Sequence, residues 1–217
     1  TTNGVGSWST QTAPVTPYAT ASAPQGLSVT PGDTTATLTW SAPASDGSSP
    51  ITGYFIEQST DGGTTWTTVV ADTESTATTY AVTGLTNGTA VAFRVSAINA
   101  AGAGAAASIG AVTPRTVPGP PATLAATPGD TQVVLTWTAP ANDGGAPVTG
   151  YSVEQSTDGG TTWTTVVTDT GSTATTYTVT GLANGDAVSF RVAAINEAGS
   201  GATAEASASP RRPADAV

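Results

Sequence analysis

The sequence contains no cysteine, histidine, methionine or lysine. Without cysteine, the chain can form no disulfide and offers no thiolate to a metal ion. Without histidine, it lacks the commonest general base and imidazole ligand, which excludes any Ser-His or Cys-His nucleophile pair. Because methionine is absent, the first residue is not an initiator, and we expect the sequence to be a segment of a longer protein.

Positive charge is scarce as well. Five arginines stand against fifteen carboxylates, which gives a net charge of −10. Such a chain has no basic patch with which to displace the counterions of a nucleic acid, so we expect no nucleic-acid partner. No apolar run approaches the roughly 20 residues that cross a bilayer, so we expect no membrane insertion.

The chain repeats itself with a period of 97 residues. This period is longer than a solenoid unit of about 20–50 residues and suits a whole small domain. The repeat therefore predicts two tandem domains. The aligned pairs include Trp40 with Trp137, Tyr54 with Tyr151, Trp66 with Trp163, Tyr80 with Tyr177, Phe93 with Phe190, and Asn99 with Asn196.

Apolar and polar residues alternate with the period of a β-strand in each repeat. The stretch TATLTWS at 35–41 shows this pattern, and the stretches at 51–59 and 90–98 repeat it. Turn signals rich in glycine, proline and aspartate separate these stretches, and no stretch has helical spacing. About seven short strands in 90 residues indicate an all-β sandwich. The side chains expected on inward faces are Ala36, Leu38, Trp40, Tyr54, Ile56, Val91, Phe93, Val95 and Ala97.

Several motifs recur at the same places in both repeats. They are Trp40 and Trp137, Gly53–Tyr54 and Gly150–Tyr151, Thr-Gly-Leu at 83–85 and 180–182, and the endings Phe-Arg-Val…Asn…Gly-x-Gly. In combination they resemble the fibronectin type III domain, over residues 24–114 and 121–210. The resemblance implies two tandem immunoglobulin-like, seven-stranded β-sandwiches.

One position departs from the family pattern. The family usually has a tyrosine two residues before the phenylalanine of the 90–98 stretch, whereas this chain has Val91 and Val188. The chain therefore lacks a hydroxyl-to-backbone hydrogen bond worth about 0.5–1.5 kcal/mol. Because valine is apolar, we expect burial at the site to be kept.

The regions between and before the domains differ in character. The joint TPRTVPGPPAT (113–123) holds four prolines, which predicts a semi-rigid spacer. The stretch NGVGSWSTQTAPVTP (3–17) resembles residues 99–114, so it is either the last strand of a preceding similar domain or a strand donated to a neighbouring copy. The expected divisions are 1–23 (terminal strand and linker), 24–114 (domain), 115–121 (linker) and 122–217 (domain and tail).

The octapeptide STDGGTTW occurs twice, at 59–66 and 156–163. It resembles the Asp-box repeat of sialidases and related β-propellers. A sialidase, however, needs a cluster of arginines and a tyrosine nucleophile, and each domain here holds one embedded arginine. Asp-Gly-Gly suits a tight turn, so we interpret the motif as a hairpin in which Ser59 and Thr65 hydrogen-bond and Trp66 covers the base.

The remaining candidate residues have structural explanations. Asp46 and Asp143 lie beside glycines, but one carboxylate per loop makes a poor calcium site. Glu57 with Arg94, and Glu154 with Arg191, suit ion pairs across neighbouring strands on the solvent face, worth at most about 1 kcal/mol. The Asn-Gly-Thr at 87–89 is a glycosylation sequon only in an organism that uses it. We therefore predict no catalytic, cofactor-binding or metal-binding residues and no cofactor.

Together these features predict a non-catalytic, extracellular spacer in a longer surface, secreted or filament protein. The expected partners are other domains of the same chain or neighbouring copies, with a polysaccharide or a cell-surface protein as further candidates. The composition resembles that of secreted proteins of high-GC bacteria. The alternatives are a carbohydrate- or protein-binding adhesion module, for which Trp8 and Tyr18 are the only aromatic candidates outside the cores, and a filament subunit that assembles through its N-terminal strand.

Overall fold

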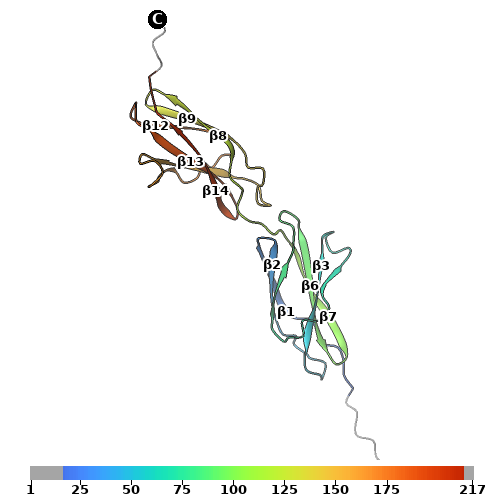
Figure 1. The fold of residues 1–217 in the computed structure, drawn as a ribbon. Helices are drawn as coiled ribbons and strands as arrows, with labels where there is room; N and C mark the ends of the chain where they lie inside the picture. Colours follow the sequence, from blue (N-terminus) through green and yellow to red (C-terminus); the bar gives the residue numbers. More distant parts are fainter. Residues whose placement is uncertain (1–16, 213–217) are drawn as a thin grey trace, which may run out of the picture.

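A computed structural model describes residues 17–212 of the protein (Figure 1). These residues form fourteen β-strands and no helix, arranged as two sandwiches of seven strands each. The predicted fold class is therefore confirmed. In the described part of the chain there is accordingly no long apolar helix that could cross a membrane.

The first sandwich packs a three-stranded sheet against a four-stranded sheet, and all strand pairs are antiparallel. The three-stranded sheet contains, in order, β1 (Gln25–Gly32), β2 (Thr35–Ser41) and β5 (Thr79–Thr83). The four-stranded sheet contains, in order, β4 (Thr67–Val70), β3 (Gly53–Ser59), β6 (Val91–Asn99) and β7 (Gly102–Val112).

The second sandwich repeats this topology. Its three-stranded sheet contains β12 (Thr176–Thr180), β9 (Gln132–Thr138) and β8 (Ala122–Gly129). Its four-stranded sheet contains β11 (Thr164–Val167), β10 (Gly150–Ser156), β13 (Val188–Asn196) and β14 (Gly199–Ala208).

Each core lies between the two sheets, where alternate side chains of the facing strands meet. All nine side chains expected on inward faces of the first repeat are buried. At the centre, the rings of Trp40 and Tyr54 meet edge to face at 4.9 Å, and those of Trp137 and Tyr151 do so at 5.0 Å. The interpretation of Trp40 as a core residue is thus confirmed, and Trp137 is buried in the same way in the second sandwich.

Val91 and Val188 occupy the position where the family usually has tyrosine. Each is only 2% exposed and packs in the core of its sandwich. The expectation that apolar burial survives at this site is therefore confirmed.

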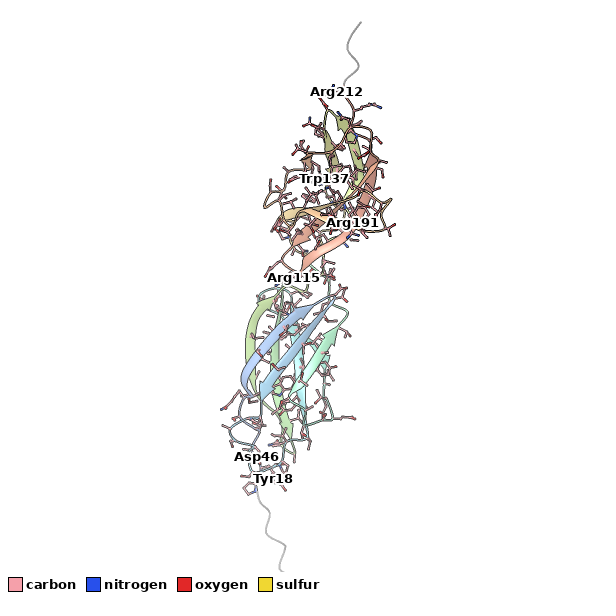
Figure 2. The ribbon with its side chains drawn as sticks, turned by 90° about the vertical axis from the view of Figure 1, so that its left-hand side faces the viewer. Tyr18, Asp46, Arg115, Trp137, Arg191 and Arg212 are labelled. Carbon is pink, nitrogen blue, oxygen red and sulfur yellow. The ribbon has the colours of Figure 1, made fainter. Side chains whose placement is uncertain are left out.

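The two sandwiches lie end to end (Figure 1). Tyr18 and Asp46 lie at one end of the described chain, Arg115 lies between the sandwiches, and Arg212 lies at the opposite end (Figure 2). The strand predicted within residues 1–16 and the candidate aromatic residue Trp8 fall outside the described residues.

Candidate functional site

The first copy of the octapeptide forms the hairpin between β3 and β4, and the second copy forms the hairpin between β10 and β11. Asp61 organises the first hairpin: the hydroxyl of Ser59 donates to Asp61 Oδ1 at 2.7 Å, and the hydroxyl of Thr65 donates to Asp61 Oδ2 at 2.6 Å. The backbone N–H groups of Thr64 and Thr65 also donate to Asp61 Oδ1, at 3.0 and 2.9 Å. Both carboxylate oxygens are therefore used in holding the turn.

Hydrogen bonding also fixes the charge of this carboxylate. The pKa of Asp61 is lowered from 3.8 to about 2, mainly by the side-chain hydrogen bond from Thr65 and then by its backbone N–H. Asp158 has the same environment, with Thr162 in the place of Thr65, and its pKa is also lowered to about 2. An acid with so low a pKa carries no proton to donate near neutral pH, so neither residue suits general acid chemistry.

Trp66 closes the hairpin as the sequence predicted. Its indole Nε1–H donates to the carbonyl of Gly63 at 3.0 Å, which lays the ring across the turn. The guanidinium of Arg94 stacks over this ring, with its Cζ 4.5 Å from the ring centroid. Arg191 stacks on Trp163 at the same distance in the second sandwich.

The same arginine forms the ion pair expected from the sequence. Arg94 donates from Nε and Nη2 to the two carboxylate oxygens of Glu57, at 2.5 and 2.8 Å, and this hydrogen bonding raises the pKa of Arg94. In the second sandwich, Arg191 Nε donates to Glu154 at 2.5 Å. The location differs from the expectation, however. Glu57 is only 9% exposed, whereas the side chain of Glu154, whose arginine stacks on a tryptophan in the same way, is 25% exposed, so only the first carboxylate is buried.

Asp46 and Asp143 hold turns, as their position beside glycines suggested. Asp46 Oδ1 accepts from the backbone N–H of Ser48, and Asp143 Oδ1 accepts from that of Gly145, both at 2.9 Å. Within residues 17–212, no three Asp, Glu, His or Cys side chains come together in a way that could hold a metal ion.

Asn87, the first residue of the sequon, also serves a turn. Its Oδ1 accepts from the backbone N–H of Thr34, and its Nδ2 donates to Asp33 at 2.7 Å. The side-chain nitrogen that a glycan would occupy is therefore already engaged by a neighbouring carboxylate.

The segment between the sandwiches is bound to both of them. On the first sandwich, Gly88 N–H donates to the carbonyl of Pro114, and Arg115 N–H donates to that of Gly32. On the second, Thr116 N–H donates to Gly144 at 2.8 Å and Gly119 N–H to Asn142 at 2.9 Å. The backbone of this segment thus bonds to the first domain through Pro114 and Arg115 and to the second through Thr116 and Gly119, which restrains the segment more firmly than its proline content alone implies.

Two further contacts join the sandwiches directly. Arg115 Nη2 donates to Glu197 at 2.7 Å in an ion pair. Gly145 of the second sandwich lies so close to the first that a Cβ on it would overlap the backbone of Asn87 and Gly88. Its φ of +84° is also a conformation that favours glycine. Ser48, at the matching position of the first domain, adopts a similar φ of +66°, so it is the close packing of the joint that requires glycine here.

A polar groove lies alongside this joint, with a cavity volume of about 640 Å³. Its lining consists of turn residues from both domains: Thr34, Leu85, Thr86, Asn87, Gly88, Thr89, Asn142, Asp143, Gly145, Ala146 and Pro147. No aromatic side chain lines it, so the groove lacks the flat stacking surface typical of carbohydrate sites.

The sequence profile of the fibronectin type III domain matches residues 22–112 and 119–210. The chain belongs to the fibronectin type III family. It is similar to the FN1–FN3 domains of chicken CNTN1 in their crystal structure, at 22% identity and a TM-score of 0.44, over 88% of this chain and 67% of that one. Among curated proteins no match is found. Fibronectin type III domains are generally non-catalytic and commonly occur in extracellular proteins.

Between these two fibronectin type III domains, the contacts at the joint were not recognised from the sequence. Gly145 and Glu197 stand where the first domain has Ser48 and Ala100, and such loop differences look like ordinary variation when two repeats are aligned. The remaining contacts at the joint are hydrogen bonds between backbone atoms, which any residue type can form, so the sequence does not indicate them. The one sequence feature that could have indicated the joint is that both of these differences between the repeats, serine to glycine and alanine to glutamate, fall in loops next to the linker.

Proposed function

We propose that this tandem pair is a non-catalytic, extracellular spacer within a longer bacterial surface, secreted or filament protein. The observation that carries the proposal is the joint, in which linker backbone groups bond to both domains and Gly145 packs on Asn87 and Gly88. A joint held on both sides keeps two sandwiches in line, as a spacer requires. Flexible linkers, by contrast, leave relative domain motion as the default.

The hydrogen bonds that engage the carboxylates support a non-catalytic role. Asp46, Asp61 and Asp143 each accept hydrogen bonds within their own turns, and Glu57 is held by Arg94. The hydrogen bonds to Asp61 lower its pKa to about 2, whereas a general acid at neutral pH needs a raised pKa.

Small-angle X-ray scattering tests the spacer proposal. We expect the full chain to scatter as one extended particle whose maximum dimension stays the same when salt is raised. A compact particle, or a broad range of shapes, would contradict the proposal. Hydrolysis of model glycosides by the purified chain would contradict its non-catalytic part.

A binding module is the second candidate, because Tyr18 is 56% exposed at the end of the first domain. An exposed aromatic ring can stack on a sugar or on a partner protein. Tryptophan fluorescence with added polysaccharide tests whether Trp8 and Tyr18 act together. A spectral shift that disappears in Trp8→Phe supports binding, whereas no shift supports the spacer.

A filament subunit is the third candidate. Among the described residues, no second strand pairs with β7 opposite β6, although Ala105 N–H on that edge donates to the carbonyl of Ala21 at 3.3 Å, so a donated strand would pair with the rest of the edge. Light scattering of the full chain beside a chain that starts at Ala23 tests this. Concentration-dependent growth of the full chain alone supports strand donation, and two monomers support the spacer.

A further inference from the structure

Each domain ends in a surface made from its first turn, the loop before its sixth strand and a Pro-Arg pair. We call this surface the tail face. It lies at the joint in the first domain and at the end marked by Arg212 in the second (Figure 2). Its residues are Gly32–Thr34, Asn87–Gly88 and Pro114–Arg115 in the first domain, and Gly129–Thr131, Asn184–Gly185 and Pro210–Arg211 in the second.

The two tail faces have the same internal hydrogen bonds. Asn184 Oδ1 accepts from Thr131 N–H at 3.0 Å, and its Nδ2 donates to Asp130 at 2.7 Å, as Asn87 does with its own neighbours. Gly185 N–H donates to the carbonyl of Pro210, and Arg211 N–H donates to that of Gly129, both at 2.9 Å. The second tail face is therefore formed in the same way as the first.

The first tail face is covered by the second domain. We call the covering surface the head face. It consists of the loop Asn142–Pro147, the loop Asn196–Ala198 and the bound linker residues 116–119. The second tail face has no such cover among the described residues: a Cβ on Gly185 would meet nothing within 4 Å, and Arg211 forms no ion pair with any of them.

The head face of the first domain differs from that of the second at the two positions that make direct contact across the joint. Its linker binds in the same way, since Ala19 N–H donates to Gly47 and Ser22 N–H donates to Ser45, both at 2.9 Å. However, Ser48 stands in the place of Gly145, where any Cβ would overlap the opposing backbone, and Ala100 stands in the place of Glu197.

We propose that the tail face of the second domain is a docking surface for a fibronectin type III head face of the second-domain type. That partner carries glycine at the position of Gly145 and a carboxylate at the position of Glu197, which pairs with Arg211. The first domain of another copy does not fit, because Ser48 meets the backbone of Asn184 and Gly185. The inference goes beyond the spacer function, since it states which modules this surface selects.

A three-domain chain tests the inference, because its third domain can be of either type. One chain consists of residues 1–211 followed by a second copy of 116–217. The matched control consists of residues 1–211 followed by a copy of 19–115, so that the linker enters at the same position. Because the chain has no native cysteine, spin labels can be attached at introduced cysteines alone. The pair Thr39→Cys and Thr136→Cys reports on the native joint. The pair formed by Thr136→Cys and the matching position of the added domain reports on the new joint.

Electron–electron double resonance gives the distance distribution across each joint. With the second-domain copy, we expect the new joint to show one narrow maximum at the distance of the native joint. With the first-domain copy, we expect a broader and shifted distribution. Gly145→Ser in the added second-domain copy is expected to broaden its joint in the same direction.

Equal widths for the two added domains, or no effect of the serine, would overturn the inference. The native joint, measured in the same chains, separates this failure from that of the spacer function. A broad native joint contradicts the spacer, whereas a narrow native joint beside a broad new joint contradicts only the docking proposal.

Discussion

A single aspartate determines the shape of each β3–β4 or β10–β11 hairpin. Asp61 accepts hydrogen bonds from two hydroxyls and two backbone N–H groups within the seven residues from Ser59 to Thr65. Because all these donors stabilise the ionised carboxylate, the pKa of Asp61 falls to about 2. A lowered pKa means that this contribution to stability is full above pH 3.8 and is lost as the pH falls through about 2.

Thr65→Val tests this cause directly. Valine keeps the shape of threonine but removes the hydroxyl donor, so we expect the pKa of Asp61 to rise from about 2 toward 3.8. Carboxyl-carbon NMR titration measures it. Thr64→Val is the control, because that hydroxyl donates to the backbone carbonyl of Asp61 and not to its carboxylate. Equal pKa changes in the two variants would contradict the assignment.

The stack of Trp66 on Arg94 is the second prediction at this scale. A cation over an aromatic face contributes about 0.5–1 kcal/mol at an exposed site. A double-mutant cycle with Trp66→Leu and Arg94→Met, followed by urea unfolding, should therefore give a favourable coupling of this size. The same cycle on Trp163 and Arg191 should agree with it. A coupling indistinguishable from zero in both domains would show that the stack contributes no stability.

At the scale of a strand, Gly53 shows why β3 begins with glycine. A Cβ there would overlap the carboxylate of Asp72, which is held in place by the backbone N–H of Glu74 at 2.9 Å. Gly150 and Asp169 repeat this arrangement in the second domain. The Gly-Tyr motif therefore pairs a core tyrosine with a residue that leaves room for the neighbouring loop.

Gly53→Ala is expected to lower the free energy of unfolding of the first domain by about 1–3 kcal/mol, the usual cost of overpacking. Gly110→Ala, in β7, is the matched control: a Cβ there meets nothing within 4 Å and its φ is not positive, so we expect little change. Urea unfolding measures both variants. A Gly53→Ala domain as stable as the control would show that the loop moves aside freely.

Most of the strand structure could be predicted from the sequence, because burial between two sheets leaves a period-two pattern. β2 matches the predicted stretch 35–41, while β3 starts two residues later than the predicted 51–59 stretch, and β6 runs one residue later at both ends than predicted. The hairpin network was also predictable, since its donors and acceptors lie within a few residues of each other. The burial of Glu57 could not be predicted, because alternation places a residue on the outer face of a strand but does not show what covers it there; Glu154, at the matching position, has a side chain that is 25% exposed.

At the scale of the whole molecule, the proposed spacer function depends on the joint. The proline count of the linker predicted stiffness, but the structure places the restraint elsewhere, in backbone hydrogen bonds to both domains and in the contact of Gly145 with Gly88. Local sequence patterns do not show such contacts, because they join loops that lie far apart in the chain. In the sequence, only the differences between matching positions of the two repeats indicate these contacts.

Two substitutions separate the contributions to the joint. Gly145→Ser introduces a Cβ that overlaps the first domain, so we expect the joint to open and the scattering profile to change. Glu197→Gln removes an ion pair in which the glutamate side chain is 70% exposed, and such pairs contribute at most about 1 kcal/mol, so we expect almost no change. If Glu197→Gln changes the profile more than Gly145→Ser does, the joint is electrostatic rather than steric.

The central claim is that the two domains are held in one fixed relation. The distance distribution between spin labels at Thr39→Cys and Thr136→Cys, exposed positions that correspond in the two domains, tests it most directly. We expect one narrow maximum that persists at high salt, because backbone hydrogen bonds and close packing are screened far less than exposed charges. A broad distribution, typical of domains that move independently on a flexible linker, would contradict the claim.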